Sequence, residues 1–214
     1  MPLIPHVIGA LAISTGGQFL VTNMLGVSET GLYVVGAQIG AVMGIASDAF
    51  VKSYGPWLYE KLQDESVVGR HFIVGITYYV FLFFLLLSGI ATVFALILFQ
   101  YVVGDKFLPV KHLTPFFIFG NGFIGMYFAI AGFFFFTSKT KFVSIVTISS
   151  GVISILAMWI LGNVWGLNGI VFGYFVSQVF MFMLAWIMSN LVYPMPWFQI
   201  RSAFAAVASV QFKK

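Results

Sequence analysis

Long apolar stretches separated by short polar or charged segments form the dominant pattern of this chain. A helix that spans a bilayer needs about 20 mostly apolar residues. The stretches reach about this length, and charged residues, glycines or prolines lie between them. The pattern predicts six membrane-spanning helices, at about residues 7–25, 31–55, 72–100, 113–137, 142–161 and 168–190.

Two helix boundaries rest on particular residues. The second helix is predicted to end at Gly55-Pro56, because proline cannot continue the backbone hydrogen bonding. Residues 142–200 carry no charge, and the cluster of glycine and asparagine at 162–169 supplies the break between the last two helices. Residues 1–192 are therefore predicted to form one six-helix transmembrane lobe, and residues 193–214 a cytoplasmic tail at the membrane surface. The fold class is all-α, a polytopic membrane helix bundle.

Composition makes a soluble domain untenable. The chain is 61% hydrophobic and only 7% charged, whereas a soluble domain carries about 25% charged residues. Too few polar groups are present to cover a globule, so membrane lipid must surround the protein. The net charge of +4 comes from basic residues scattered between apolar runs, which favours a topology signal over binding to nucleic acid. The absence of cysteine excludes disulfides and thiolate metal sites.

The distribution of basic residues predicts the orientation. With six spans, both termini share one side of the membrane with the 57–70 segment and the 138–141 turn. That side carries eight basic residues: Lys52, Lys61, Arg70, Lys139, Lys141, Arg201, Lys213 and Lys214. The opposite side carries Lys106 and Lys111. Because basic residues concentrate on the cytoplasmic side, both termini are predicted to lie in the cytoplasm.

Two sets of glycines indicate close helix packing. Gly36, Gly40 and Gly44 recur every four residues in the second helix, and Gly169 and Gly173 do so in the sixth. Small residues at this spacing let another helix approach closely in a membrane. The motif Gly120-Asn121-Gly122-Phe123-Ile124-Gly125 matches a dinucleotide fingerprint, but it lies inside a membrane-length helix and no acid follows about twenty residues later. That match is accidental.

Asp48 and Lys52 are the most informative charged residues. They are four residues apart with the acid first, the favourable order for an ion pair on a helix. A charge at the centre of a spanning helix costs at least about 2.5–3.5 kcal/mol on insertion scales. The pair is therefore expected either at the headgroup zone, with Lys52 extending to the phosphates, or facing a polar cavity.

Buried amides form the remaining candidate site. Gln18, Gln38, Asn121 and Gln178 all fall within predicted spans. Each is expected either to hold neighbouring helices together by hydrogen bonds, worth about 0.6 kcal/mol, or to line a substrate cavity with Lys52 and Asp48. The three histidines fall at separate helix boundaries and Asp48 has no acidic partner, so no catalytic residue, metal site or cofactor is predicted and the chain is not expected to be an enzyme.

Several motifs in this order resemble one protein family. They are Pro2-Leu3-Ile4-Pro5-His6, Leu25-Gly26, Gly31-Leu32-Tyr33, Gln38-Ile39-Gly40, Ala49-Phe50, Pro56-Trp57-Leu58-Tyr59-Glu60-Lys61-Leu62, and more loosely Lys139-Thr140-Lys141, Gly166-Leu167-Asn168-Gly169 and Tyr193-Pro194-Met195-Pro196-Trp197. The chain resembles the lipid-linked oligosaccharide flippases of polysaccharide (O-antigen, lipopolysaccharide) biosynthesis, within the multidrug/oligosaccharidyl-lipid/polysaccharide exporter superfamily. The resemblance covers nearly the whole chain, and the first sixty residues are the specific part.

The resemblance implies a carrier in the cell inner (plasma) membrane that moves an undecaprenyl-pyrophosphate-linked glycan by alternating access. Two departures stand out. Gly17-Gln18 replaces the usual Asp-Arg pair, which leaves Lys52 as the only deep cation, and Ser154 and Met158 replace asparagines of the fifth helix.

Length is the third departure, because family members have two six-helix lobes and this chain resembles the second lobe alone. A separate N-terminal lobe or a homodimer partner is therefore expected. The alternatives are a cation-coupled multidrug exporter of the same superfamily, or a non-transporting membrane scaffold or truncated remnant.

Overall fold

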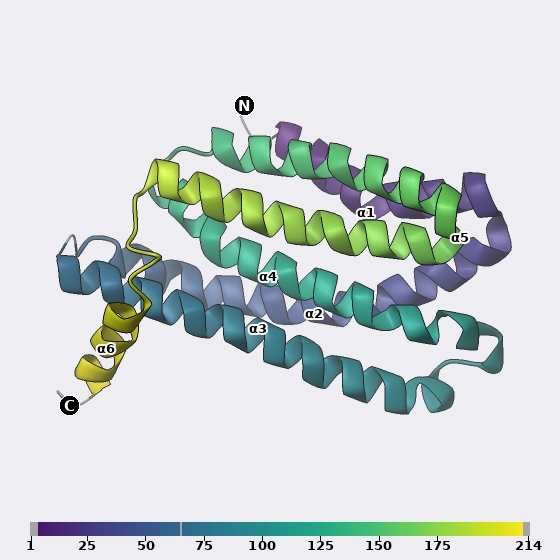
Figure 1. Cartoon of the computed structure of the whole chain (residues 1–214), viewed down its shortest axis with the longest axis horizontal. Coiled ribbons are helices and arrows are strands. Elements are labelled where there is room, and N and C mark those ends of the chain that lie inside the picture. The colour runs from purple at the N-terminus through teal and green to yellow at the C-terminus, as the bar shows by residue number, and fades with distance from the viewer. Residues whose placement is uncertain (1–3, 65, 212–214) are drawn as a thin grey trace.

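The computed structural model describes residues 4–64 and 66–211, and nearly all of this part of the chain is helical (Figure 1). The elements are α1 (Ile4–Leu25), α2 (Val27–Lys61), α3 (Val67–Val102), the 3-10 helix η1 (Asp105–Leu113), α4 (Thr114–Phe136), α5 (Lys141–Val192) and α6 (Ile200–Gln211). No strand occurs among the described residues. The predicted all-α bundle is confirmed.

Five elements are long and apolar enough to cross a membrane. The last of them, α5, has 52 residues, and its backbone leaves the helical conformation at Gly166, with φ of 59° and ψ of −136°. A positive φ of this kind is readily adopted only by glycine. The chain reverses there, so α5 forms an antiparallel hairpin whose two arms run side by side in Figure 1. By length and composition the helices can therefore make the six passes of a multi-pass membrane protein.

The predicted end of the second helix at Gly55-Pro56 is wrong, because α2 continues through Pro56 to Lys61. Proline removes one backbone hydrogen bond, and Pro56 lies on an exposed face. Buried Tyr54, Leu58 and Leu62 flank it and hold the last turns against the bundle. The predicted aqueous segment 57–70 is consequently reduced to the short connection after Lys61.

The connection between α2 and α3 is stabilised locally. The Ser66 hydroxyl accepts a hydrogen bond from the Gly69 amide at 3.0 Å and caps the first turn of α3. Hydrogen bonds from Ser66 also lower the pKa of Asp64, whose Oδ1 accepts from the Ser66 amide at 3.0 Å. With 36 residues, α3 is about 54 Å long, well above the roughly 30 Å of the hydrocarbon core. The α2–α3 hairpin therefore extends beyond the bilayer.

Helix α4 is the centre of the bundle, with α2 and α3 on one side and α5 on the other (Figure 1). Glycines permit these contacts. Gly36 of α2 packs against the ring of Phe117 and Gly40 against its Cβ and backbone, while Gly125 of α4 packs against the ring of Phe84 of α3. The predicted packing of Gly44 is not found, because a Cβ there would meet no described atom within 4 Å.

The two arms of α5 are in backbone contact. A Cβ at Gly169 would collide with the carbonyl of Leu161, and one at Gly173 would lie 2.7 Å from the backbone nitrogen of Met158. The predicted packing role of Gly169 and Gly173 agrees with these contacts, although the partner is the preceding arm of the same hairpin. Helix α1 packs on this hairpin as well.

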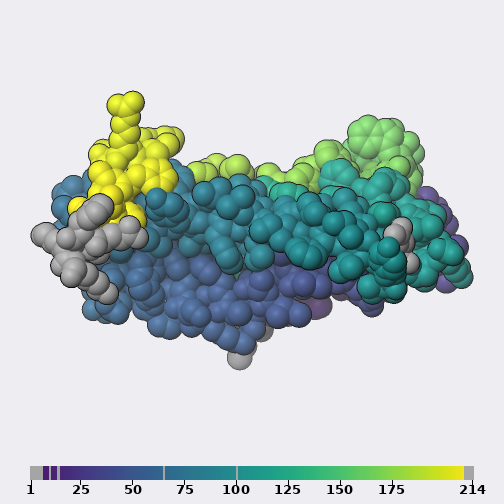
Figure 2. All heavy atoms as spheres, turned by 90° about the horizontal axis from the view of Figure 1, so that it is seen from below, coloured from purple at the N-terminus to yellow at the C-terminus, as the bar shows by residue number. Residues whose placement is uncertain are grey.

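Helix α6 crosses the end of α3 at a steep angle to the long helices, and Figure 2 shows it projecting from one end of the body. Ala203 packs closely on Gly75 of α3. His71 of α3 hydrogen-bonds to Oε1 of Gln199, just before α6, at 2.7 Å. This orientation suits a helix that lies along a membrane surface, so the interfacial tail stays a prediction with geometric support.

Replacing Gly173 by alanine tests the packing of the hairpin. The added methyl group has no space beside Met158, so Gly173→Ala is expected to lower the free energy of unfolding by about 1–3 kcal/mol. The matched control is Gly44→Ala, where the methyl group enters open space and no loss is expected. Thermal unfolding in detergent compares the two, and equal stability of both variants would contradict this account of the packing.

Candidate functional site

Polar side chains of α1 and α2 meet close to the turn that joins these helices. The turn is made at Gly26, whose φ is 94°. Thr22 of α1 and Thr30 of α2 lie across it, with their hydroxyl oxygens 2.9 Å apart. Gln18 lies one turn before Thr22 on the same face of α1, and its side chain is exposed. This contact therefore connects the polar face of α1 to one face of α2.

Helical periodicity extends that face along α2. Asp48 follows Thr30 by 18 residues, which is about five complete turns. Lys52 and Gln38 are offset from Thr30 by less than about a quarter turn. We call the polar residues of this surface the α1–α2 polar face: Gln18, Thr22, Thr30, Gln38, Asp48 and Lys52. Exposed Ile45 lies among them on α2.

Asp48 and Lys52 form the predicted ion pair. The Nζ atom of Lys52 lies 2.6 Å from Oδ2 of Asp48, and the two side chains are 73% and 66% exposed. The pair therefore faces outward from the described chain. A close, exposed pair of this kind leaves one side of the ammonium group open to a further acceptor.

The depth of this pair follows from its neighbours. Phe50, which lies between the two charged residues, has its ring centroid 5.2 Å from that of Phe84. Phe84 in turn packs on Gly125. Phe84 and Gly125 are the middle residues of α3 and α4. The pair is consequently level with the middle of the bundle.

Lipid is a poor environment for this surface. Charged side chains in spanning helices almost always face the protein interior or water, because hydrocarbon solvates them badly. Exposed amides such as those of Gln18 and Gln38 carry a similar though smaller penalty. The α1–α2 polar face therefore requires water or another protein surface against it.

Asn121 and Gln178 lie elsewhere, within the interface between α4 and α5. Asn121 donates to the carbonyl of Phe117 at 2.9 Å and to the hydroxyl of Tyr174 at 3.2 Å. Gln178 is fully buried beside Tyr174, and its amide atoms make no hydrogen bond of good geometry among the described residues. The structure does not bring these two amides to Lys52. Asn121 links α4 to α5 by a well-formed hydrogen bond, whereas the contact of Gln178 with Tyr174 is poorly aligned.

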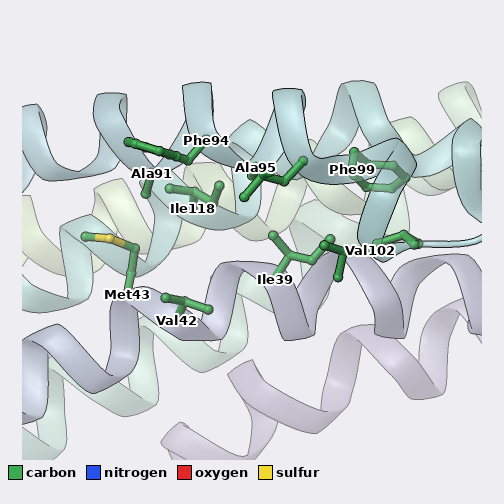
Figure 3. A pocket seen from close by; sticks show the side chains of 11 residues that line it. Ile39, Val42, Met43, Ala91, Phe94, Ala95, Phe99, Val102 and Ile118 are labelled. Carbon is green, nitrogen blue, oxygen red and sulfur yellow. The ribbon is translucent and has the colours of Figure 1, made fainter.

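Sequence reasoning also missed an apolar groove. A hollow of ≈ 340 Å³ lies where α3 diverges from α2 and α4 (Figure 3). Ile39 and Met43 of α2, Phe94 and Phe99 of α3, and Ile118 of α4 line it. Its lining offers no charged group to an anion, and it is suited to hydrocarbon. The only signal in the sequence is the strongly apolar run of α3 from Val80 to Phe99, which Ser88, Gly89 and Thr92 alone interrupt.

The histidine and acidic side chains of the described residues are not gathered at one place. No group of three or more histidine, aspartate or glutamate side chains lies close enough to hold a metal ion in this part of the chain. His71 bonds to Gln199, and Nε2 of His112 lies 3.1 Å from Oδ1 of Asn168 at the opposite end of the bundle. Both histidines therefore connect helix ends rather than meet at a common site.

Comparison with known proteins adds no family. No protein-family model, curated protein or solved structure matches the chain. The α1–α2 polar face is therefore the feature of the chain from which a function can be inferred.

The contrast between the two amides can be measured. Gln178→Leu removes a buried amide that makes no well-formed hydrogen bond, so it is expected to raise the free energy of unfolding by about 1–3 kcal/mol. Asn121→Leu breaks two hydrogen bonds and is expected to lower it by about 0.5–1.5 kcal/mol. Thermal unfolding in one detergent compares both variants. Destabilisation by Gln178→Leu would contradict the proposed absence of a well-formed hydrogen bond.

Proposed function

We propose that this chain is one lobe of a flippase that carries an undecaprenyl-pyrophosphate-linked oligosaccharide across the inner membrane in polysaccharide biosynthesis. The observation that carries the proposal is the exposed Asp48–Lys52 pair, held level with the middle of a bundle of otherwise apolar helices. The sequence resemblance to oligosaccharide flippases is consistent with it. A membrane carrier needs polar groups of this kind at the depth through which its polar cargo passes.

The chemistry of the α1–α2 polar face fits such a cargo. The pyrophosphate is an anion, and the ammonium group of Lys52 is a compact donor that suits a phosphate oxygen. Asp48 holds this ammonium group at 2.6 Å, so that Lys52 is not an unpaired cation. Gln18 and Gln38 offer amide donors and acceptors to sugar hydroxyls. Because Gln18 takes the place of a family arginine, Lys52 is assigned the main contact with the anion.

A second lobe would complete the site. Alternating access moves one helix bundle against another around a site between them, and the α1–α2 polar face is exposed on this bundle. A separately encoded N-terminal lobe or a second copy of this chain would cover it. Surrounding membrane lipid would contact the apolar remainder, including the exposed side of α3.

A cation-coupled drug exporter is less well supported. Such a carrier needs a carboxylate that is free to exchange a proton or metal ion, and Asp48 is the only acid at mid-depth among the described residues. Its close pair with Lys52 already supplies a positive partner. The pair therefore favours an anionic cargo.

The orientation is proposed from the charges at the two ends of the bundle. Lys61, Arg70, Lys139, Lys141 and Arg201 lie towards the end where α2 finishes and α5 begins, and Lys106 and Lys111 lie at the other (Figure 1). Lys52 is level with the middle, and Lys213 and Lys214 lie outside the described residues. The excess supports a cytoplasmic location for the first end, and thus for both termini.

Cysteine labelling at the two ends of α2 tests this orientation. The chain has no native cysteine, and Ser28 and Gln63 are both exposed. In intact cells, an impermeant maleimide is expected to label Ser28→Cys and to leave Gln63→Cys unlabelled until the membrane is opened. The opened membrane is the control for reactivity. Labelling of Gln63→Cys alone in intact cells would indicate the opposite orientation.

Substitution of Lys52 tests the proposed function. The chain is expressed with a matched N-terminal lobe, and separately alone, in a strain that lacks its own flippase. Lys52→Ala is expected to lower surface glycan by roughly tenfold or more, because a hydrogen bond to a charged group is lost. Lys52→Arg should retain most export. Lys111→Ala, at the end of the bundle, is the matched control, and membrane insertion is checked by immunoblot.

Normal export by Lys52→Ala would remove this residue from the transport site. If the wild-type chain exports glycan only with the second lobe, the one-lobe proposal is supported. Export by the chain alone would instead indicate that copies of it assemble the site.

A further inference from the structure

A pocket with aromatic walls lies at the junction of α3, α5 and the segment that leads to α6. Its volume is ≈ 390 Å³, and its lining includes Tyr78, Trp186, Asn190, Leu191, Trp197 and Phe198. The Leu191 and Phe198 side chains are 72% and 97% exposed. The pocket is therefore a surface site with apolar rims, away from the α1–α2 polar face.

Hydrogen bonds and ring contacts build this pocket. The hydroxyl of Tyr78 donates to the carbonyl of Trp197 at 2.7 Å. The rings of Trp186 and Trp197 meet edge to face with centroids 5.7 Å apart. The bond between His71 and Gln199 fixes the chain immediately after Phe198. The walls are therefore held in place without a ligand.

The position of the pocket corresponds to the membrane–water interface. It lies at the end of the second arm of α5, next to the steeply crossing α6 (Figure 1). Tryptophan and tyrosine concentrate at the headgroup level of membrane proteins because their rings are amphipathic. A phospholipid is the molecule that meets such a surface from the bilayer.

Two buried donors at this junction have no acceptor among the described residues. Trp197 is 4% exposed, and its indole Nε1 makes no hydrogen bond. The Nε atom of Arg70 is also buried and without a partner, and its guanidinium carbon lies 5.7 Å from the centre of the Tyr193 ring. Buried donors in folded proteins usually have acceptors. Protein atoms enclose both donors, so they polarise the junction positively without touching a ligand, and the guanidinium that a ligand can reach is that of exposed Arg201.

Basic side chains outnumber acidic ones at this junction, although the Asp64 carboxylate lies directly against Gly69, next to Arg70. Neither α3 nor α5 nor α6 contains an aspartate or glutamate, and no acid follows Asp105 in the chain. Arg70 lies on α3, and Arg201 is exposed in the first turn of α6, two residues after Gln199. An anion is attracted to this junction, and a zwitterionic headgroup gains less.

We propose that this pocket binds an anionic phospholipid. Its phosphate oxygens accept from the exposed guanidinium of Arg201, and one acyl chain lies along Leu191 and Phe198. The bound lipid anchors α6 at the membrane surface. This site is independent of cargo transport.

Native mass spectrometry of the full chain in detergent tests the proposal, with phosphatidylglycerol and phosphatidylcholine of identical acyl chains as probes. The wild-type chain is expected to retain more phosphatidylglycerol. Arg201→Gln should weaken that binding by about fivefold, the contribution of one basic residue near an anionic lipid. Leu191→Trp, which fills the apolar rim, should reduce the retention of both lipids.

Two variants provide matched controls. Lys111→Gln removes a basic residue at the opposite end, and Ile160→Trp enlarges an exposed aliphatic side chain on the other arm of α5. Both should bind like the wild type. Equal retention of the two lipids by the wild-type chain would overturn the proposal, and this comparison needs no variant. It would also be overturned if Arg201→Gln and Leu191→Trp bound lipid as well as their controls.

Discussion

Close approach between helices is the constraint on which this bundle depends. Lipid tails are as apolar as leucine, so burial from water does not drive membrane helices together, and dispersion contacts must do so. Glycine supplies the necessary space around α4. Phe117 fits against Gly36 and Gly40 of α2, and Phe84 fits against Gly125. The same contacts fix the relative depth of α2, α3 and α4, and hence the level at which Asp48 and Lys52 lie.

The bundle treats its polar groups in two different ways. Between α4 and α5, Asn121 is satisfied by Tyr174 and by the backbone, so the amide contributes to helix association. On α1 and α2, polar side chains point away from the core and remain exposed. The first arrangement needs nothing from outside the described chain. The exposed arrangement on α1 and α2 becomes favourable only when water, cargo or another lobe faces it. For this reason the proposed function is assigned to these side chains and not to Asn121.

The sequence predicted the helices well because membrane thickness sets the length of an apolar stretch. The reversal within residues 162–169 was also predicted, and Gly166 supplies it. Pro56 does not end α2 as predicted, because the packing of Leu58 and Leu62 outweighs the loss of one hydrogen bond. A four-residue step advances about 40° around a helix, so the third glycine, Gly44, has rotated away from Phe117.

The candidate site was predicted less completely. The spacing of Asp48 and Lys52 was sufficient to predict their ion pair, because both lie on one helix. The sequence did not indicate which neighbouring helix the side chains of Asn121 and Gln178 face. Their helices are apolar on every side, so the pattern does not distinguish one neighbour from another. The long-range contacts of Phe50 and Phe84, which establish the depth of the ion pair, join different helices and have no signature in local sequence.

The hairpin of α5 has a consequence for biogenesis. From residue 142 to residue 200 the chain carries no charge, so its tip can pass through a bilayer without transferring an ion. The arms contact each other through Gly169 and Gly173, and a reversal at Gly166 keeps them together. They can therefore leave the translocation machinery and enter lipid as one preassembled unit. The connection between α3 and α4 differs, because it carries Asp105, Lys106 and Lys111, which in the proposed orientation would each be moved across.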